Sequence, residues 1–112
     1  PMLNGDLVTG KVGKNIGIED TKKAARLCGL AIISQLNEAP DLNLDKIKRI
    51  IKLGGLVNCI DEFTQQPEII NGASDLMVEI FGDKGKHSRF AVGTNSLPRN
   101  VVVEIEAVAE IH

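Results

Sequence analysis

The run from Val101 to Ile111 limits the fold more than any other stretch, because its residues alternate with a period of two. Glu104, Glu106 and Glu110 fall on one side of the run. The other side carries an apolar residue at every second position: Val101, Val103, Ile105, Ala107, Ala109 and Ile111. A helix would scatter the glutamates around its circumference, whereas a strand gives side chains this period. The run therefore predicts a β-strand with one face on a hydrophobic layer.

An extended run around Arg89–Gly93 precedes this strand and is joined to it by a turn. The connecting residues 94–100 have the composition of a loop, and Pro98 cannot donate a hydrogen bond to a sheet ladder. One arginine, Arg89, therefore lies on the first run and Glu104 on the second.

Two segments have helical spacing of their apolar residues. The first is expected over 20–38, with acidic residues at its positive N-terminal end and the turn-forming residues 39–41 ending it. One face of this helix carries Ala24, Leu27, Cys28, Ala31 and Gln35, and its apolar stripe is widened by Leu30, Ile33 and Leu36. The second is expected over 67–81, with Pro67 in its first turn and Gly82 as its C-cap. Its stripe is Ile69, Ala73, Leu76 and Ile80, backed by Ile70, Met77 and Phe81.

The segment between the helices is rich in β-branched residues, which favours a strand over about 48–58. A helix over 42–52 is the alternative. Gly54-Gly55 within the strand predicts a bulge or a close approach of another group to the backbone. Together with a turn-rich start, these elements predict one α+β domain over 1–112, a mixed sheet with two helices on one face.

Composition excludes several classes of function. The net charge is −2 without a basic block, and aromatic residues make up 3%, so a nucleic-acid partner is not expected. No apolar run reaches the roughly 18 residues that span a membrane. Cys28 and Cys59 lie in apolar runs and are expected to be buried free thiols. We expect a cytoplasmic protein without a metal or cofactor.

Candidate chemical groups gather in the second half of the chain. Arg89 suits bidentate binding of a carboxylate, and Glu104 suits accepting a proton or orienting a water; both could equally be surface residues of a sheet. His87 is a general base, a ligand or a loop histidine. The polar stretch 71–74 within the second helix is either a substrate contact or a tight packing junction.

The pattern Arg89, then Leu97-Pro98, then VEIEAVA over 103–109 resembles the C-terminal signature of the Rid family (RidA/YjgF, also called the endoribonuclease L-PSP family). More specifically, NGASDLMVEIFGDKGKHSRFAVGTNSLP is similar to the branch of that family with the pattern NGASDL…FG..G.H.R.AVG…LP. The resemblance covers essentially the whole chain.

The resemblance implies a chorismate-mutase-like subunit and a homotrimer with ligand clefts between subunits. The family activity it implies is hydrolysis of reactive enamines and imines to keto acids and ammonia. By the same resemblance, Arg89 would hold the substrate carboxylate, Glu104 would position the attacking water, and Asn71 would line the cleft. The partners implied are further copies of the chain and a small carboxylate or imino acid.

Two features depart from the family pattern. Ala91 stands where the best-known members have a cysteine, which favours a trimer that binds small carboxylates without turnover. The family's older name adds a third alternative, an endoribonuclease or translation inhibitor.

The second departure is at the start of the sequence. Pro1 matches a point just after an SGQ-like strand, so the family's first two strands are expected to lie outside the given sequence.

Overall fold

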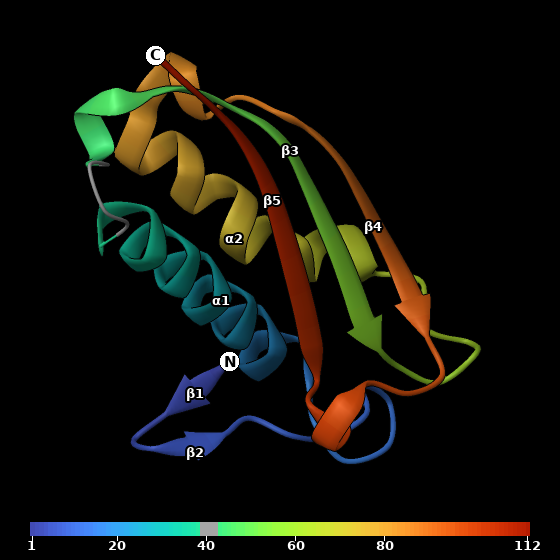
Figure 1. Cartoon of the computed structure of the whole chain (residues 1–112). Helices are drawn as coiled ribbons and strands as arrows, with labels where there is room; N and C mark the ends of the chain where they lie inside the picture. Colours follow the sequence, from blue (N-terminus) through green and yellow to red (C-terminus); the bar gives the residue numbers. More distant parts are fainter. Residues whose placement is uncertain (39–42) are drawn as a thin grey trace.

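The computed structural model describes residues 1–38 and 43–112. In this part of the chain, a three-stranded sheet has the order β4-β3-β5 and two long helices cover one of its faces (Figure 1). The central strand β3 spans Ile47–Asn58, β4 spans Ser88–Thr94 and β5 spans Val103–Ile111. The expected α+β architecture, with two helices on one face of a mixed sheet, is confirmed.

The sheet is mixed because β3 pairs in parallel with β4 and antiparallel with β5. The two C-terminal strands therefore lie on opposite sides of β3 and do not pair with each other. Their connection includes the short helix η3, Pro98–Asn100, in which Arg99 and Asn100 both have a φ of 57°. The turn expected between the strands is thus a crossover past the end of β3.

The two helices pack against each other as well as against the sheet. Helix α1 spans Ile18–Glu38 and α2 spans Gln66–Phe81, each within two residues of the sequence prediction. Gly82 is the C-cap of α2, as expected, with its N–H donating to the carbonyl of Val78. The expected ending of α1 at residues 39–41 lies outside the described residues.

The buried faces of the helices differ in part from the predicted stripes. In α1 the fully buried residues are Thr21, Ala24, Ala25 and Gly29, whereas Leu30, Ala31 and Gln35 are exposed. In α2, Ile80 is also exposed. The difference arises because α1 turns its small residues towards α2: a Cβ on Gly29 would lie 3.4 Å from the Cα of Ala73.

The segment over 43–58 is a strand preceded by one short 3-10 turn, Leu44–Lys46, so the helical alternative is wrong. The register shifts of β3 fall between Ile47 and Lys52 rather than at the glycines. Gly54 and Gly55 instead allow close approach, because an added Cβ would lie 2.5 Å from the Phe90 ring or from Ile70, respectively.

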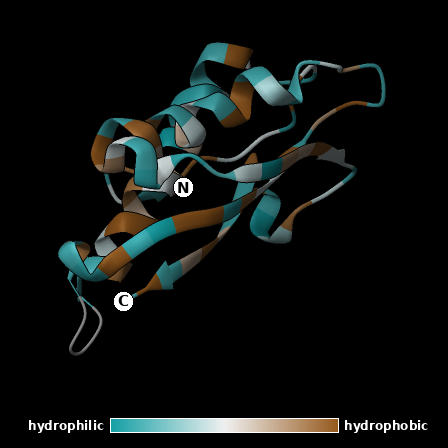
Figure 2. Cartoon of the chain, turned by 90° about the horizontal axis from the view of Figure 1, so that it is seen from above, coloured by the Kyte–Doolittle hydropathy of each residue, from teal (hydrophilic) through white to brown (hydrophobic). Residues whose placement is uncertain are grey.

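The sheet has one covered and one bare face. Strand β5 contributes Val103, Ile105, Ala107 and Ala109 to the core beneath the helices, as its alternation predicts. Its glutamates lie on the opposite face, and hydrophilic and hydrophobic residues alternate along the strands (Figure 2). β5 begins two residues later than expected, because Val101 and Val102 bond to the N-terminal segment: Thr9 bridges to Val101, and Val102 donates to the Val8 carbonyl.

The N-terminal segment adds a two-stranded ribbon, β1 (Met2–Leu3) and β2 (Asp6–Leu7), which is separate from the main sheet. Val12 then pairs with Cys59 and extends the contacts at the end of β3. None of the described helices is both long and apolar enough to cross a bilayer.

Candidate functional site

Arg89 lies near the start of the edge strand β4, on the side of the sheet that faces the helices. Its Nη1 donates a hydrogen bond of 2.7 Å to Oδ1 of Asn71 on α2. Its register partner is Leu53, which is buried beneath α2. Within the described residues, Arg89 has no carboxylate partner, unlike Arg26 and Arg49, which pair with glutamates. The guanidinium is therefore held in place by a neutral amide with donors left for an external anion.

Glu104 lies on the bare face of the sheet, two strands away from Arg89. The pairing register aligns Val92, Leu56 and Glu104 in one row across the three strands, so their side chains share a face. Arg89 is three residues from Val92 along β4 and points to the opposite face. One chain alone thus brings Arg89 together with Asn71 but does not bring Arg89 together with Glu104.

A shallow cleft of about 350 Å³ surrounds Glu104 on the bare face. Leu56, Phe90 and Glu106 are among the residues that line it. Lys52 pairs with Glu106 at 3.7 Å and lies 5.2 Å from the centre of the Phe90 ring. Glu104 has no cation within ion-pairing distance in the described residues. Its carboxylate is therefore free to act on a group that enters this cleft.

Ala91 lies two residues after Arg89 and shares its face of β4. Its methyl group is half-buried and packs against the core cluster that contains Ile70 and Val57. The position thus offers only apolar surface beside the arginine.

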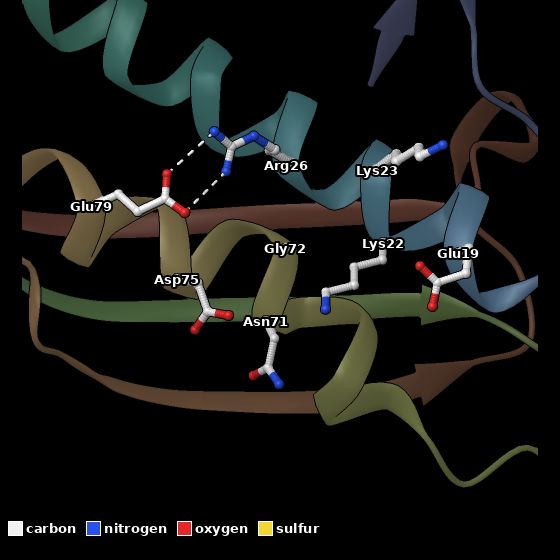
Figure 3. A pocket seen from close by; sticks show the side chains of 8 residues that line it. All are labelled: Glu19, Lys22, Lys23, Arg26, Asn71, Gly72, Asp75 and Glu79. Atoms are coloured by element: carbon white, nitrogen blue, oxygen red, sulfur yellow. Dashed lines mark hydrogen bonds and ion pairs between the residues drawn. The ribbon is translucent and has the colours of Figure 1, made fainter.

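A groove of about 290 Å³ runs between the two helices on the outer side of the molecule (Figure 3). Arg26 and Glu79 pair across it at 3.3 Å, and Asn71 points away from this ion pair (Figure 3). The helices are in close contact at Gly72, where an added Cβ would collide with the backbone carbonyl of Lys22. The polar stretch 71–74 therefore combines a tight junction, at Gly72, with a polar contact to the sheet, at Asn71.

His87 and Ser74 form a second polar contact, between α2 and the residue that precedes β4. Ser74 Oγ lies 2.5 Å from Nε2 of His87, and Nδ1 of His87 lies 2.5 Å from the carbonyl oxygen of Gly85. Both side chains are half-buried. The Ser74–His87 and Asn71–Arg89 bonds are neighbouring links from α2, because Asn71 and Ser74 are three residues apart on the helix and their partners lie just before β4 and at its second residue.

Two cysteines and the acidic residues complete the set of reactive groups. Burial raises the pKa of the Cys28 thiol above its ordinary value, and the charge of Glu104 adds to this increase. Cys28 and Cys59 are both free. Within residues 1–38 and 43–112, no three His, Cys, Asp or Glu residues are grouped so as to hold a metal ion.

The sequence did not reveal the pairing of Ser74 with His87. The two residues are 13 positions apart in the chain, so no local pattern indicates their contact. The signal in the sequence is that the polar positions 71 and 74 share a helix face, while His87 and Arg89 lie two residues apart where β4 begins.

Comparison with known proteins agrees with the fold. A family model described as "YjgF/chorismate mutase-like, putative endoribonuclease" matches residues 1–111. Protein TCP17 of Trypanosoma cruzi is 39% identical over 109 residues, which are 96% of this chain and 68% of that protein.

Two solved structures are also similar. The crystal structure of Atu1372 from Agrobacterium tumefaciens, a protein of unknown function, has a TM-score of 0.94 and 44% identity, covering 99% of this chain and 72% of that one. A "putative endoribonuclease" from Shewanella oneidensis has a TM-score of 0.90 and 34% identity, covering 98% and 73%. The mixed sheet, its two helices and these matches together establish that the chain belongs to the YjgF/chorismate mutase-like family.

Proposed function

We propose that this protein is a hydrolase of small 2-imino acids and their enamine tautomers, acting as a homotrimer. The proposal rests on how the guanidinium of Arg89 is held. Its guanidinium is held by Asn71 at 2.7 Å and has no carboxylate partner among the described residues. An arginine fixed in this way is suited to binding a substrate carboxylate through two parallel hydrogen bonds.

The trimer is proposed because Arg89 and Glu104 lie on opposite faces of one sheet. A site that uses both side chains needs the bare face of one copy beside the β4 edge of another. The bare face has the composition of an interface, since Val92 and Val108 are 45% and 47% exposed on it. Glu104 from one copy would then approach Arg89 of its neighbour.

In the proposed reaction, Arg89 binds the carboxylate and thereby orients the adjacent imine carbon. Glu104 accepts a hydrogen bond from a water, which adds to that carbon. The resulting carbinolamine then collapses to the keto acid with release of ammonia. An enamine substrate is first protonated on carbon to give the imine. Asn71 contributes by holding the guanidinium in one orientation.

The test is ammonia release from freshly generated 2-aminoacrylate. We expect Arg89→Ala to lose most of the enzymatic rate, because it removes the carboxylate anchor, and Glu104→Gln to lower the rate while retaining binding of the keto acid. Arg26→Ala is the matched control, since Arg26 is an exposed arginine that pairs with Glu79 away from the sheet. Turnover that survives in Arg89→Ala would refute the proposal.

A second candidate is a trimer that binds small carboxylates without turnover. Ala91 favours it, because only a methyl group stands beside Arg89 on the same face of the strand. Titration with 2-ketobutyrate, followed by calorimetry, distinguishes the two: Arg89-dependent binding without ammonia release indicates the binding protein. An assay of RNA cleavage tests whether this chain has the activity by which the Shewanella relative is described.

We propose a cytoplasmic location, which the free thiols Cys28 and Cys59 support.

A further inference from the structure

The hydrogen bonds around His87 determine which ring nitrogen carries the proton. The carbonyl oxygen of Gly85 is only an acceptor, so Nδ1 of His87 must donate to it. In the neutral imidazole, Nε2 then has a free lone pair, and the hydroxyl of Ser74 donates to it across 2.5 Å. The Ser74 hydroxyl thus donates its proton to a base, the His87 imidazole, and the Gly85 carbonyl orients that base. This is the arrangement of an activated nucleophile.

The neighbouring hydrogen bond, between Arg89 and Asn71, supplies two more groups. Arg89 has only donors, so the atom of Asn71 that faces it is the amide oxygen. The amide nitrogen of Asn71 therefore remains a donor, and it has no partner among the described residues. Asn71 lies three residues before Ser74 on α2, so their Cβ atoms are about 5–6 Å apart on one face. A side-chain amide at this spacing can stabilise negative charge that develops on an oxygen beside Ser74.

We propose that Ser74 is the nucleophile of an acyl-transfer site, with His87 as its base, Asn71 as the donor to the oxyanion and Arg89 as the anchor for a substrate carboxylate. The substrate class is a small activated ester whose acyl group carries a second, free carboxylate. This site goes beyond imine hydrolysis and does not depend on it, since Glu104 and a second copy of the chain take no part.

The reaction balances without a further reagent. Ser74 Oγ attacks the ester carbonyl carbon, its proton passes to Nε2 of His87, and the carbonyl electron pair moves onto the oxygen beside Asn71. The tetrahedral intermediate collapses, the bond to the leaving oxygen breaks, and His87 returns the proton to that oxygen as the alcohol departs. Water then attacks the acyl-serine ester, again losing its proton to His87, which restores the Ser74 hydroxyl and releases the acid.

The same hydrogen bonds would also be present if His87 had a purely structural role, because they connect the turn η2, Gly82–Gly85, to α2. The two roles differ in one property of His87. A structural link needs only a hydrogen-bond acceptor for Ser74, whereas nucleophilic attack needs a base. His87→Gln separates them, because a glutamine side chain retains an amide oxygen that accepts from Ser74 but cannot take its proton.

The test uses the whole folded chain and a fluorophosphonate probe, which forms a stable phosphorus–oxygen bond with an activated serine as fluoride leaves. Peptide mass spectrometry should find one adduct per chain, on Ser74. We expect Ser74→Ala to show none. His87→Gln and His87→Ala should label roughly a hundredfold more slowly, because a positioned base contributes about 10²–10⁴ in rate. Added imidazole should restore part of the rate in His87→Ala.

Ser34→Ala is the matched control, since the Ser34 hydroxyl faces the Glu38 carboxylate on an exposed helix and has no histidine. It should label Ser74 at the wild-type rate. Hydrolysis of mono-p-nitrophenyl succinate should exceed that of p-nitrophenyl acetate in the wild type, and Arg89→Ala should remove the preference. Absence of a Ser74 adduct, equal labelling after unfolding in urea, or an unchanged labelling rate in a folded His87→Gln variant would each overturn the proposal. Circular dichroism identifies which variants are folded.

Discussion

At the scale of single residues, Gly72 is tightly constrained where α1 and α2 cross. A Cβ at this position would collide with the carbonyl oxygen of Lys22 and lie 3.2 Å from the amide nitrogen of Arg26. We expect Gly72→Ala to lower the free energy of unfolding, because overpacking costs about 1–3 kcal/mol and alanine gains only about 1 kcal/mol over glycine in a helix. Urea unfolding followed by circular dichroism measures the difference.

Gly29→Ala is the control for this substitution. Gly29 lies on the opposite helix of the same interface, but the nearest atom to its added Cβ is the terminal Cδ2 of Leu76 at 3.0 Å. A flexible side chain can move where a backbone carbonyl cannot, so this variant should be as stable as the wild type or slightly more stable. A larger loss for Gly29→Ala than for Gly72→Ala would contradict the packing described.

Cys28 makes stability depend on pH in a defined direction. Burial raises the pKa of its thiol in the folded chain, so the folded protein keeps this proton at a pH where the unfolded chain has lost it. The contribution is fully present below the unfolded pKa and is lost as the pH rises through the folded pKa. We expect Cys28→Ala to lose less stability than the wild type between about pH 7 and about pH 10. Urea unfolding of both proteins at a series of pH values measures this. An equal change of the free energy of unfolding with pH in the two proteins would contradict the prediction.

At the scale of elements, β3 organises the sheet, and its two adjacent glycines meet different surroundings. We expect Gly55→Ala to lower the free energy of unfolding by about 1–3 kcal/mol, because its Cβ would lie 2.5–3.0 Å from three atoms of the buried Ile70 side chain. Gly54→Ala should cost less in thermal or urea unfolding, because the Phe90 ring that it meets is partly exposed and can swing away. The reverse order would show that the bare face is packed more rigidly than the covered one.

The sequence predicted the elements better than their pairing. The bounds of α2 and β3 follow from local signals, namely Pro67, Gly82 and the β-branched run, and the structure confirms them to within one residue. The position of β3 between β4 and β5 is a long-range contact that no local pattern encodes. The same limit applied to the candidate site. Residue type indicates Arg89 and Glu104 as candidates, but only the register shows that they occupy opposite faces.

At the scale of the whole molecule, the bare face of the sheet should join identical copies. We expect sedimentation equilibrium to give three times the 12.1 kDa mass of the chain. Val92→Asp or Val108→Asp should reduce the mass to that of one chain without unfolding it, because both side chains are already about half exposed in the single chain. If the copies stayed associated, the new aspartate would be buried at the interface and would lose its hydration.

Val78→Asp is the matched control for association, since Val78 is 40% exposed on the outer side of α2. It should leave the mass unchanged. If the wild type sediments as a single chain, or if Val78→Asp dissociates it as well as Val92→Asp does, the bare face is not the contact between copies.

The dual role of β5 has a consequence for how the protein is made. This strand supplies side chains to both core clusters, and it lies beside β3 although the whole of α2 and β4 comes between them in the chain. While the ribosome is still translating, the nascent polypeptide therefore has an open hydrophobic interior, and the interior can close only once β5 has been translated and has left the exit tunnel. A premature stop codon just before Val103 should therefore be as harmful as one just before α2.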